Sequence, residues 1–346
     1  MSVWASQLAE IYDVSVLLYG RSEKEYPISD KVKIYTVASK YNEYKKFSYF
    51  KRFSRMRRII KDISPDIMIN FLPRMQIWTM IASFGMKIFR IETVRNSPWE
   101  LCRSSRIEHW LWMMCYRRAN AVILQTQEQG EYFSKKIRRK CIVIPNPIDK
   151  QYVGSNKNYS GEKLKKFVAA GRLTPQKNYP LMVRAFASAY KRNPGITLSI
   201  YGSENDDKTE YTNYLNSLIR ELRMEGIIRL MGRTKQMRQV LLENDAFIMS
   251  SNFEGMPNSL IEAMAVGLIC ISTNCKTGPK DLIDDKTNGF LVEVGNEDAF
   301  ADAICQVADL EPDQIENIGK AARQKILSLC SDENSINRLI DMISRL

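Results

Sequence analysis

Residues 250–267 read S-S-N-F-E-G-M-P-N-S-L-I-E-A-M-A-V-G, and they show the pattern of a strand, a loop and a helix most clearly. An apolar run typical of a buried strand ends near Ser250, and a loop containing Gly255 follows it. Pro257 suits the first turn of a helix, and Gly267 suits the far end of that helix. A strand that leads through a short loop into a helix is the building unit of a parallel sheet.

The same alternation runs along the whole chain. Short runs rich in β-branched residues predict strands, and stretches with helical periodicity separate most of them. The predicted strands are Asp13–Tyr19, Val32–Val37, Asp66–Phe71, Ile88–Val94, Ala121–Gln125, Cys141–Ile144, Phe167–Ala170, Thr197–Tyr201, Ile228–Met231, Ala246–Ser250, Ile269–Thr273 and Gly289–Val292. Three helices are predicted near 297–308, 312–328 and 334–345. The predicted fold class is α/β, with two doubly wound parallel sheets.

A linker is predicted over residues 147–163, which are poor in apolar residues and follow two prolines. It divides the chain into a domain over 1–150 and a domain over 151–346, and whether the last helix packs back on the first domain stays open. Two such sheets are expected to face each other across a cleft, at the carboxyl ends of the strands, where α/β folds bind ligands.

The charge of the chain is unevenly distributed. The net charge of the 346 residues is +12, and residues 1–150 carry 27 Lys or Arg against 14 Asp or Glu. Residues 151–346 carry 24 and 25, so the second half is close to neutral. This asymmetry predicts an anionic partner for the first half: nucleic acid, a membrane surface or a phosphorylated substrate.

The most basic stretch is Lys45–Lys61, with eight basic residues, no acidic residue, and apolar residues at helical spacing. One interpretation is a helix that packs on the sheet and exposes a solvated basic face. The other is a helix at an anionic membrane surface, with Arg55, Arg57 and Arg58 facing the lipid. Basic residues interleaved with aromatic ones also suit single-stranded nucleic acid.

Several classes of site are excluded by what the sequence lacks. His109 is the single histidine, so no H-E-x-x-H zinc site exists, and we expect it to be a packed or partly exposed helix residue. Neither a G-x-G fingerprint nor a G-K-[ST] phosphate loop occurs. The seven cysteines form no C-x-x-C pair and indicate reduced thiols, and no apolar run is long enough to cross a bilayer. The acidic pairs at 206–207 and 284–285 are interpreted as surface turns rather than metal ligands.

Two groups of residues carry the predicted chemistry. Arg172 and Lys177 follow the strand Phe167–Ala170, and their cations suit phosphate oxygens. The helix that begins after Pro257 is expected to point its free amide groups at the same phosphate oxygens. The amino end of a helix is a common binding site for phosphate. These amides belong to Asn258, Ser259 and Leu260. The carboxylates of Glu254 and Glu262 are expected to face that ligand, one at each end.

These residues carry a resemblance to a known family. Four motifs resemble those of family 4 glycosyltransferases, which have the GT-B fold. They are G-R-L-x-x-Q-K-N from Gly171, E-G-M-P-N-S-L-I-E-A-M-A-x-G from Glu254, N-G-F-L-V from Asn288 and I-P-N-P-I-D from Ile144. In the first half, V-R-N-S-P from Val94 looks like the bacterial branch that builds O-antigens, capsules, exopolysaccharides and lipid-linked glycans.

The resemblance implies a retaining sugar transfer from a nucleotide sugar, without a metal or other cofactor. It implies that Glu254 contacts the donor sugar, that Glu262 holds the ribose, and that Arg172 and Lys177 stabilise the departing diphosphate. It adds further donor-binding residues: Gly255, Met256, Asn258, Ser259, Leu260, Gly202 and Gly232. Arg95 and Asn96 stand where many members carry a histidine near the donor, and Arg95 is either a site residue or part of a structural salt bridge.

The predicted enzyme is a hexosyl- or N-acetylhexosaminyltransferase of surface glycan (lipopolysaccharide or exopolysaccharide) biosynthesis. A UDP-sugar is favoured as donor and GDP-mannose stays open; the acceptor implied is a polyprenyl-diphosphate-linked glycan. The predicted location is cytoplasmic, peripheral at the inner face of the bacterial cytoplasmic membrane, with no nucleic-acid partner. The alternatives are a nucleic-acid-binding protein that uses the basic half, and an inactive relative of the family.

The resemblance breaks at the amino terminus. Family members open with a strand, a glycine-rich loop and a helix, whereas here Ser2–Tyr12 looks like that first helix and Asp13–Tyr19 like the second strand. The absent strand would lie in mid-sheet, so its loss would leave two unpaired sheet edges. We therefore expect an amino-terminally shortened version of a longer enzyme, less stable and weak or inactive.

Overall fold

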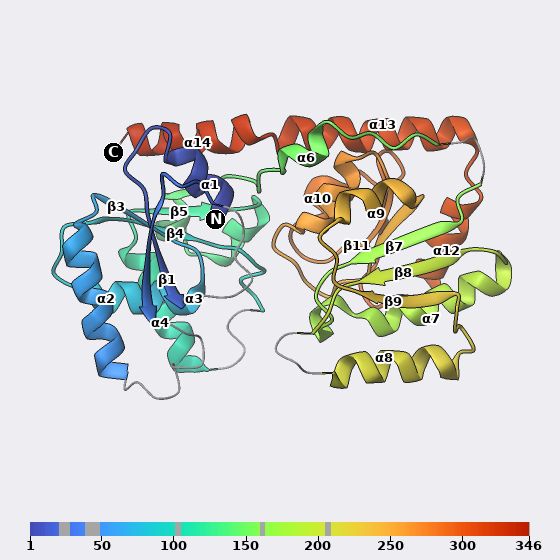
Figure 1. The fold of residues 1–346 in the computed structure, drawn as a ribbon, viewed down its shortest axis with the longest axis horizontal. Coiled ribbons are helices and arrows are strands. Elements are labelled where there is room, and N and C mark those ends of the chain that lie inside the picture. The colour runs from blue at the N-terminus through green and yellow to red at the C-terminus, as the bar shows by residue number, and fades with distance from the viewer. Residues whose placement is uncertain (21–27, 39–48, 101–104, 160–162, 205–208, 346) are drawn as a thin grey trace. The chain divides into compact units, whose positions relative to one another are not determined.

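The computed structural model describes residues 1–20, 28–38, 49–100, 105–159, 163–204 and 209–345. The chain forms two compact units (Figure 1). Unit 1 comprises Met1–Pro147 with Glu333–Leu346, and unit 2 comprises Ile148–Asp332. All pairings between the described strands are parallel, so each unit is an α/β structure of the predicted class.

Unit 2 contains one continuous six-stranded sheet, in the order β12-β11-β10-β7-β8-β9. The strands are β7 Lys166–Ala170, β8 Thr197–Tyr201, β9 Ile228–Gly232, β10 Ala246–Met249, β11 Ile269–Thr273 and β12 Phe290–Val292. The order reverses between β7 and β10, which are neighbours in the middle of the sheet. This reversal is the topological switch point at which doubly wound folds bind ligands.

Helices cover both faces of this sheet. They are α6 Lys150–Val153, α7 Tyr179–Arg192, α8 Glu210–Glu221, α9 Met237–Glu243, α10 Asn258–Ala265, α11 Pro279–Leu282, α12 Glu297–Ala308 and α13 Pro312–Leu329, with a 3₁₀ turn at Pro175–Lys177. The apolar sides of α7, α8 and α12 form one core cluster with the sheet, and those of α9, α10 and α13 form another. Because both faces are covered, every residue of β10 and β11 is buried, and β10 is apolar throughout.

Unit 1 differs because its described strands form two separate sheets. The strands are β1 Ser15–Gly20, β2 Lys33–Ala38, β3 Ile67–Asn70, β4 Phe89–Thr93, β5 Ala121–Leu124 and β6 Cys141–Val143. β1 pairs with β2, and the order in the second sheet is β3-β4-β5-β6. No pairing joins β1 to β3 within the described residues.

The helices of unit 1 are α1 Ser2–Leu8, α2 Tyr49–Ile63, α3 Pro73–Ala82, α4 Arg106–Arg118, α5 Lys135–Arg138 and α14 Asp332–Ser344, with a 3₁₀ turn at Glu128–Tyr132. Side chains connect the two sheets although their backbones do not pair. Leu17 of β1 and Met68 of β3 share a core cluster with α2 and α3. Leu339 of α14 packs in another cluster with Trp4 of α1 and Ile91 of β4.

The sequence predicted these elements well. A strand lies at each of the twelve predicted positions, and α12, α13 and α14 lie at the three predicted carboxyl-terminal helices. The predicted linker, in contrast, is packed against unit 2 over its described part. Tyr152 is buried, and the Tyr159 hydroxyl accepts a hydrogen bond from the Ile269 amide at 3.1 Å. The segment contains few apolar residues, so its composition did not indicate that these two tyrosines pack against the rest of unit 2.

Candidate functional site

The candidate site lies in unit 2, at the carboxyl ends of the neighbouring strands β7 and β10. Hydrogen bonds join the loop that follows β7 to the loop that follows β10. The Asn252 amide donates to the Gln176 carbonyl at 2.8 Å, and Gln176 Nε2 donates to the Phe253 carbonyl at 2.9 Å. Ser250 Oγ donates to the Lys177 carbonyl at 2.8 Å. The two loops are therefore fixed to each other at the topological switch point.

The centre of this arrangement is an ion pair between Lys177 and Glu254. Lys177 Nζ lies 2.6 Å from Glu254 Oε1, and their side chains are only 14% and 8% exposed. Thr277 Oγ1 also donates a hydrogen bond to the Glu254 carbonyl. A charge-assisted hydrogen bond in such a dry place holds both side chains in one orientation. The structure therefore brings together two residues that lie 77 positions apart in the sequence.

Arg172 lies in the same loop as Lys177 but in a different environment. Its side chain is exposed, and it makes no ion pair within the described part of the chain. Its guanidinium is therefore available to a ligand, whereas the ammonium of Lys177 is already paired with Glu254. A planar guanidinium suits two phosphate oxygens at once.

Gly202 and Gly232 hold the ends of β8 and β9 close to this loop. The Gly202 amide donates to the Gly232 carbonyl at 2.8 Å, and a Cβ on Gly202 would lie only 1.8 Å from the Gly171 carbonyl oxygen. The φ angle of Gly202 is +150°, which side chains rarely allow. Gly202 is therefore required by the close approach of two backbones, directly beside Arg172.

The amino end of α10 has fewer free amide groups for a ligand than the sequence predicted. The helix begins at Asn258, with Pro257 as its N-cap residue. The Leu260 amide already donates to the Pro257 carbonyl at 3.2 Å, so it is not the free amide that we expected. Met256 is buried, and the Gly255 carbonyl lies so near Gly278 that a Cβ there would be 2.3 Å away. The entry to α10 is thus tightly packed backbone.

Glu262 lies one turn inside α10 and has a separate set of partners. Burial raises the pKa of its carboxyl to about 7, while a hydrogen bond from the Tyr152 hydroxyl acts in the opposite direction. The negative charge of Asp149 adds to the increase. Burial therefore shifts this carboxyl toward its protonated form, which donates one hydrogen bond, whereas the ionised form only accepts them.

Arg95 and Asn96 lie in unit 1, directly after β4. The Arg95 guanidinium lies between the rings of Trp4 and Phe71, 4.4 Å and 4.8 Å from their centroids. Its Nη1 donates to Asn146 Oδ1 at 3.0 Å, while Nε and Nη2 are buried and have no hydrogen-bond partner among the described residues. Burial lowers the pKa of Arg95 to about 10. No salt bridge to Arg95 occurs within the described ranges.

The three arginines predicted to face a membrane are not equivalent. Arg55 and Arg58 are exposed on α2. Arg57 is half-buried, and its Nη1 donates to the carbonyls of Ala82 and Phe84 at 2.8 Å each. Arg57 therefore stabilises the end of α3. His109 is half-buried on α4, and its Nδ1 lies 3.4 Å from the Tyr132 hydroxyl.

The acidic pairs give no metal site in the part of the chain that the structure describes. Asp206 and Asp207 lie outside the described residues. Asp284 pairs with Lys325 at 2.6 Å, and Asp285 accepts a hydrogen bond from the Leu291 amide at 2.9 Å. Among the described residues no group of three His, Cys, Asp or Glu residues is placed to hold a metal ion. Likewise, no helix of the described ranges is long and apolar enough to cross a membrane.

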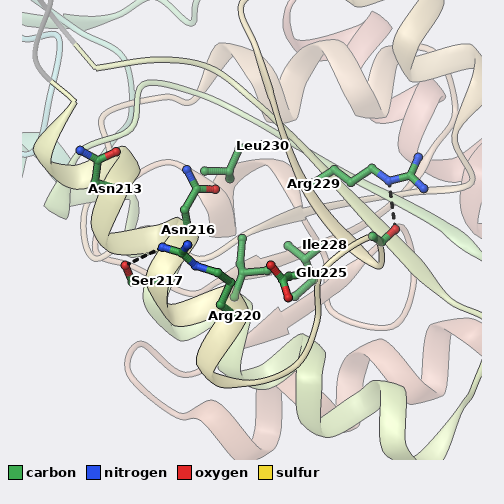
Figure 2. A pocket seen from close by; sticks show the side chains of 10 residues that line it. Asn213, Asn216, Ser217, Arg220, Glu225, Ile228, Arg229 and Leu230 are labelled. Carbon is green, nitrogen blue, oxygen red and sulfur yellow. Dashed lines mark hydrogen bonds between the residues drawn. The ribbon is translucent and has the colours of Figure 1, made fainter.

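A surface pocket lies at a different place in unit 2 (Figure 2). It is lined by residues of α8 and of the amino end of β9, among them Asn213, Arg220 and Arg229. Arg229 Nε donates to the Gly226 carbonyl at 2.9 Å. None of the predicted site residues lines this pocket, and it lies at the opposite end of β9 from Gly232.

Sequence analysis missed the residues that support the site. Gln176, Ser250 and Thr277 connect the loops around Lys177 and Glu254, and Tyr152 supports Glu262. Gln176 and Ser250 stand inside the quoted motifs, so their position was a signal. Thr277 and Tyr152 come from distant parts of the chain, and only the folded structure brings them to the site.

Comparison with known proteins agrees with this architecture. Residues 154–325 match the family described as Glycosyl transferases group 1, and residues 1–126 match the one described as Glycosyl transferase 4-like. An uncharacterized glycosyltransferase of Methanocaldococcus jannaschii is 29% identical over 68% of this chain and 62% of its own length. The amylovoran biosynthesis glycosyltransferase AmsD of Erwinia amylovora is 26% identical, over 86% of this chain and 81% of AmsD.

Two further proteins are informative. The UDP-Gal:alpha-D-GlcNAc-diphosphoundecaprenol alpha-1,3-galactosyltransferase of Escherichia coli is 28% identical over 73% of this chain and 68% of its own. The crystal structure of Anabaena HepE in complex with UDP-glucose superposes with a TM-score of 0.81, at 15% identity, over 99% of this chain and 94% of HepE. At that identity the likeness concerns the fold, which is GT-B.

The two parallel α/β units and the likeness to solved structures place the fold in the GT-B class. Within that class, the chain belongs to the group 1 glycosyltransferases, with relatives in the biosynthesis of bacterial exopolysaccharide and lipid-linked glycans. The resemblance to family 4 is thereby confirmed.

Proposed function

We propose that this chain transfers one sugar from a UDP-sugar to a polyprenyl-diphosphate-linked glycan, with retention of the anomeric configuration and without a metal. The observation that carries the proposal is the Lys177–Glu254 ion pair on two loops fixed to each other at the switch point, with Arg172 exposed in the first of these loops. The HepE complex contains UDP-glucose, and the E. coli relative is named for a UDP-galactose donor and a diphosphoundecaprenol acceptor.

In the proposed reaction the chain's residues supply charge and position. Arg172 and Lys177 neutralise the diphosphate as the bond between the anomeric carbon and its phosphate oxygen breaks. The acceptor hydroxyl attacks from the same face and passes its proton to the departing phosphate. Glu254 accepts hydrogen bonds from the donor sugar, and its pairing with Lys177 keeps it oriented. Each such electrostatic contact is worth about 3–4 kcal/mol in the transition state.

Glu262 has a separate role in the proposal. Its carboxylate accepts hydrogen bonds from the ribose hydroxyls, while Gly202 and Gly232 let the nucleotide approach the backbone. Gly255, Met256, Asn258 and Ser259 shape the entry to α10 around the donor. The rim of unit 1 around Arg95 and Asn96 serves the acceptor or the donor sugar. The enzyme works at the inner face of the cytoplasmic membrane.

The test is a transfer assay with a matched set of donors. UDP-galactose, UDP-glucose, UDP-N-acetylglucosamine, UDP-N-acetylgalactosamine and GDP-mannose are each offered with a short-chain prenyl-diphosphate-linked acceptor, with and without EDTA. We expect one UDP-sugar to react, EDTA to leave the rate unchanged, and NMR to show an α-linkage formed from the α-configured donor. A β-linked product excludes retention, loss of activity in EDTA excludes a metal-free reaction, and transfer from GDP-mannose alone excludes the UDP-sugar donor.

A further inference from the structure

The surface of unit 1 carries an apolar patch on α3 and α4 that the proposed function has not yet used. Four of its side chains are large, apolar and exposed: Ile81 45%, Phe84 66%, Ile107 72% and Trp110 56%. Ile81, Phe84 and Trp110 also line one pocket with Met80, Leu111, Met114 and Arg118, and Ile107 lies one helical turn before Trp110 and Leu111 on α4. Single exposed apolar residues are ordinary, but a contiguous group of this kind marks an interaction site.

Arginines surround this patch. Arg118 of α4 lies over the Phe84 ring, 5.5 Å from its centroid. On the other side, Arg57 of α2 donates hydrogen bonds to the Ala82 and Phe84 carbonyls. Arg118 thus lies over the Phe84 ring, while Arg57 binds the Phe84 backbone carbonyl. Arg117 and Arg106 are exposed on α4.

The three helices place this charge side by side. α3 packs against α2 and against α4 (Figure 1). Together the helices carry ten Lys or Arg residues and two acidic ones, Asp62 and Glu108, and Glu108 pairs with Arg74 at 3.7 Å. Exposed Arg55 and Arg58 lie on the same helix as Arg57. An apolar centre with a cationic rim is complementary to a bilayer, which has an anionic surface above an apolar interior.

We propose that Phe84, Ile107 and Trp110 insert into the acyl boundary of an anionic membrane, while the surrounding arginines bind lipid headgroups. The inference rests on the proposed function only in that a lipid-linked acceptor lies in such a membrane. The apolar patch is a different surface from the basic face of α2. The basic face attracts the protein to the membrane, and the patch then anchors the protein by burying apolar side chains in the membrane. Binding then has a part that salt does not remove, since only the attraction between charges is screened.

The test uses sedimentation with vesicles of phosphatidylcholine and phosphatidylglycerol at low and at high salt. The variants Phe84→Ser and Ile107→Ser are compared with Tyr214→Ser and Met231→Ser, whose side chains in unit 2 are also large and exposed. We expect the patch variants to lower the partition coefficient about tenfold, and to remove the salt-resistant fraction. The unit 2 variants are expected to bind like the wild type. Patch variants that bind like the wild type at both salt concentrations overturn the proposal.

Trp110 gives a direct readout of depth. Lipids brominated on the acyl chain quench tryptophan fluorescence only at close range, and Trp112 on the same helix is buried and serves as an internal control. We expect such vesicles to quench the wild type, and the variant Trp110→Phe to lose most of that quenching while its binding persists. Equal quenching of both proteins overturns insertion. A wild-type dimer in solution that Phe84→Ser converts to a monomer assigns the patch to a second copy instead.

The assay separates this proposal from the proposed function. Transfer to a water-soluble acceptor analogue is expected to be equal in the wild type and in Phe84→Ser, because Phe84 is not one of the residues assigned to the donor or the acceptor. If no donor reacts with either protein while insertion is observed, the proposed function fails and the insertion stands. If transfer is normal and insertion is absent, the proposed function stands and the proposal of membrane insertion fails.

Discussion

The two units of this chain are made from the same alternation of strands and helices, yet they solve different physical problems. Unit 2 has one continuous six-stranded sheet, and the loops at its switch point are connected by several hydrogen bonds. Unit 1 has its described strands in two sheets and carries most of the positive charge. It also buries Arg95, two of whose nitrogens have no hydrogen-bond partner among the described residues. A continuous sheet fixes side chains precisely enough for chemistry, while the helices of unit 1 present charge and apolar surface outward.

The largest expected effect distinguishes two buried ion pairs of unit 2. Lys177 pairs with Glu254 at the carboxyl end of β10, and Lys157 pairs with Asp245, 3.3 Å away, just before that strand begins. Lys177→Ala is expected to lower the transfer rate per folded molecule 100- to 1,000-fold, by roughly 3–4 kcal/mol, because it removes a cation from the departing diphosphate.

The control is Lys157→Ala. It also leaves a carboxylate without its partner, so it is expected to lower the free energy of unfolding while the transfer rate of the folded fraction is retained. Rates are measured with saturating donor and corrected for the folded fraction by circular dichroism. Equal losses of transfer rate in both variants would show that the loss of any buried ion pair lowers the rate. That result would contradict the assignment of Lys177 and Glu254 to the active site.

A second contrast concerns backbone packing. Gly202→Ala is expected to cost about 3 kcal/mol or more, because its Cβ would collide with the Gly171 carbonyl, 1.8 Å away. Gly226→Ala also has a positive φ, +80°, but no atom lies within 4 Å of its Cβ, so about 1 kcal/mol is expected. Urea unfolding of both variants measures the difference. Similar losses of stability would mean that strain in φ, and not the close approach, determines the need for glycine at 202.

These contrasts also show what the sequence could and could not predict. Buried apolar runs such as β10 fix strand positions by themselves, so the elements and the α/β class were predictable. The positions of Glu254 and Lys177 came from motifs, but their ion pair did not, because it joins side chains 77 residues apart. The amide of Leu260 was misjudged because a tight first turn uses it. The buried Arg90–Glu92 pair of unit 1, 2.8 Å apart, left no pattern in the sequence.

A third prediction uses the raised pKa of Glu262. The unfolded carboxyl has its ordinary pKa of 4.5 and the folded one a pKa of about 7, so between these values the folded state holds a proton that the unfolded state has lost. The free energy of unfolding therefore decreases as the pH rises from about 4.5 to about 7, by roughly 3 kcal/mol from this residue.

The variant Glu262→Gln lacks this titration and is expected to have a shallower dependence of stability on pH. Glu92 of unit 1 contributes in the same direction, because burial also raises its pKa to about 7, so part of the slope remains. Unfolding in urea at pH 5 and pH 8 gives both slopes. If Glu262→Gln keeps the complete slope of the wild type, Glu262 is not the group that titrates.

The smallest expected effect tests the charge of unit 1. Arg55→Glu with Arg58→Glu is expected to weaken binding to anionic vesicles by about 2 kcal/mol, since each basic residue near the surface contributes about 1 kcal/mol. The matched control is Arg184→Glu with Lys320→Glu. It changes the net charge by the same amount at exposed positions of two helices of unit 2. Sedimentation at low salt compares the two. Equal losses would mean that net charge alone, and no particular surface, attracts the protein to the membrane.

The central claim is that the donor nucleotide binds to unit 2 at the carboxyl ends of β7 and β10. Titration calorimetry with UDP tests it most directly, on the wild type, Arg172→Ala and Arg229→Ala. Arg172 follows β7, whereas Arg229 lines the pocket at the amino end of β9 (Figure 2). We expect Arg172→Ala to weaken UDP binding at least tenfold and Arg229→Ala to leave it unchanged. Loss of binding in Arg229→Ala, with Arg172→Ala binding like the wild type, would contradict it.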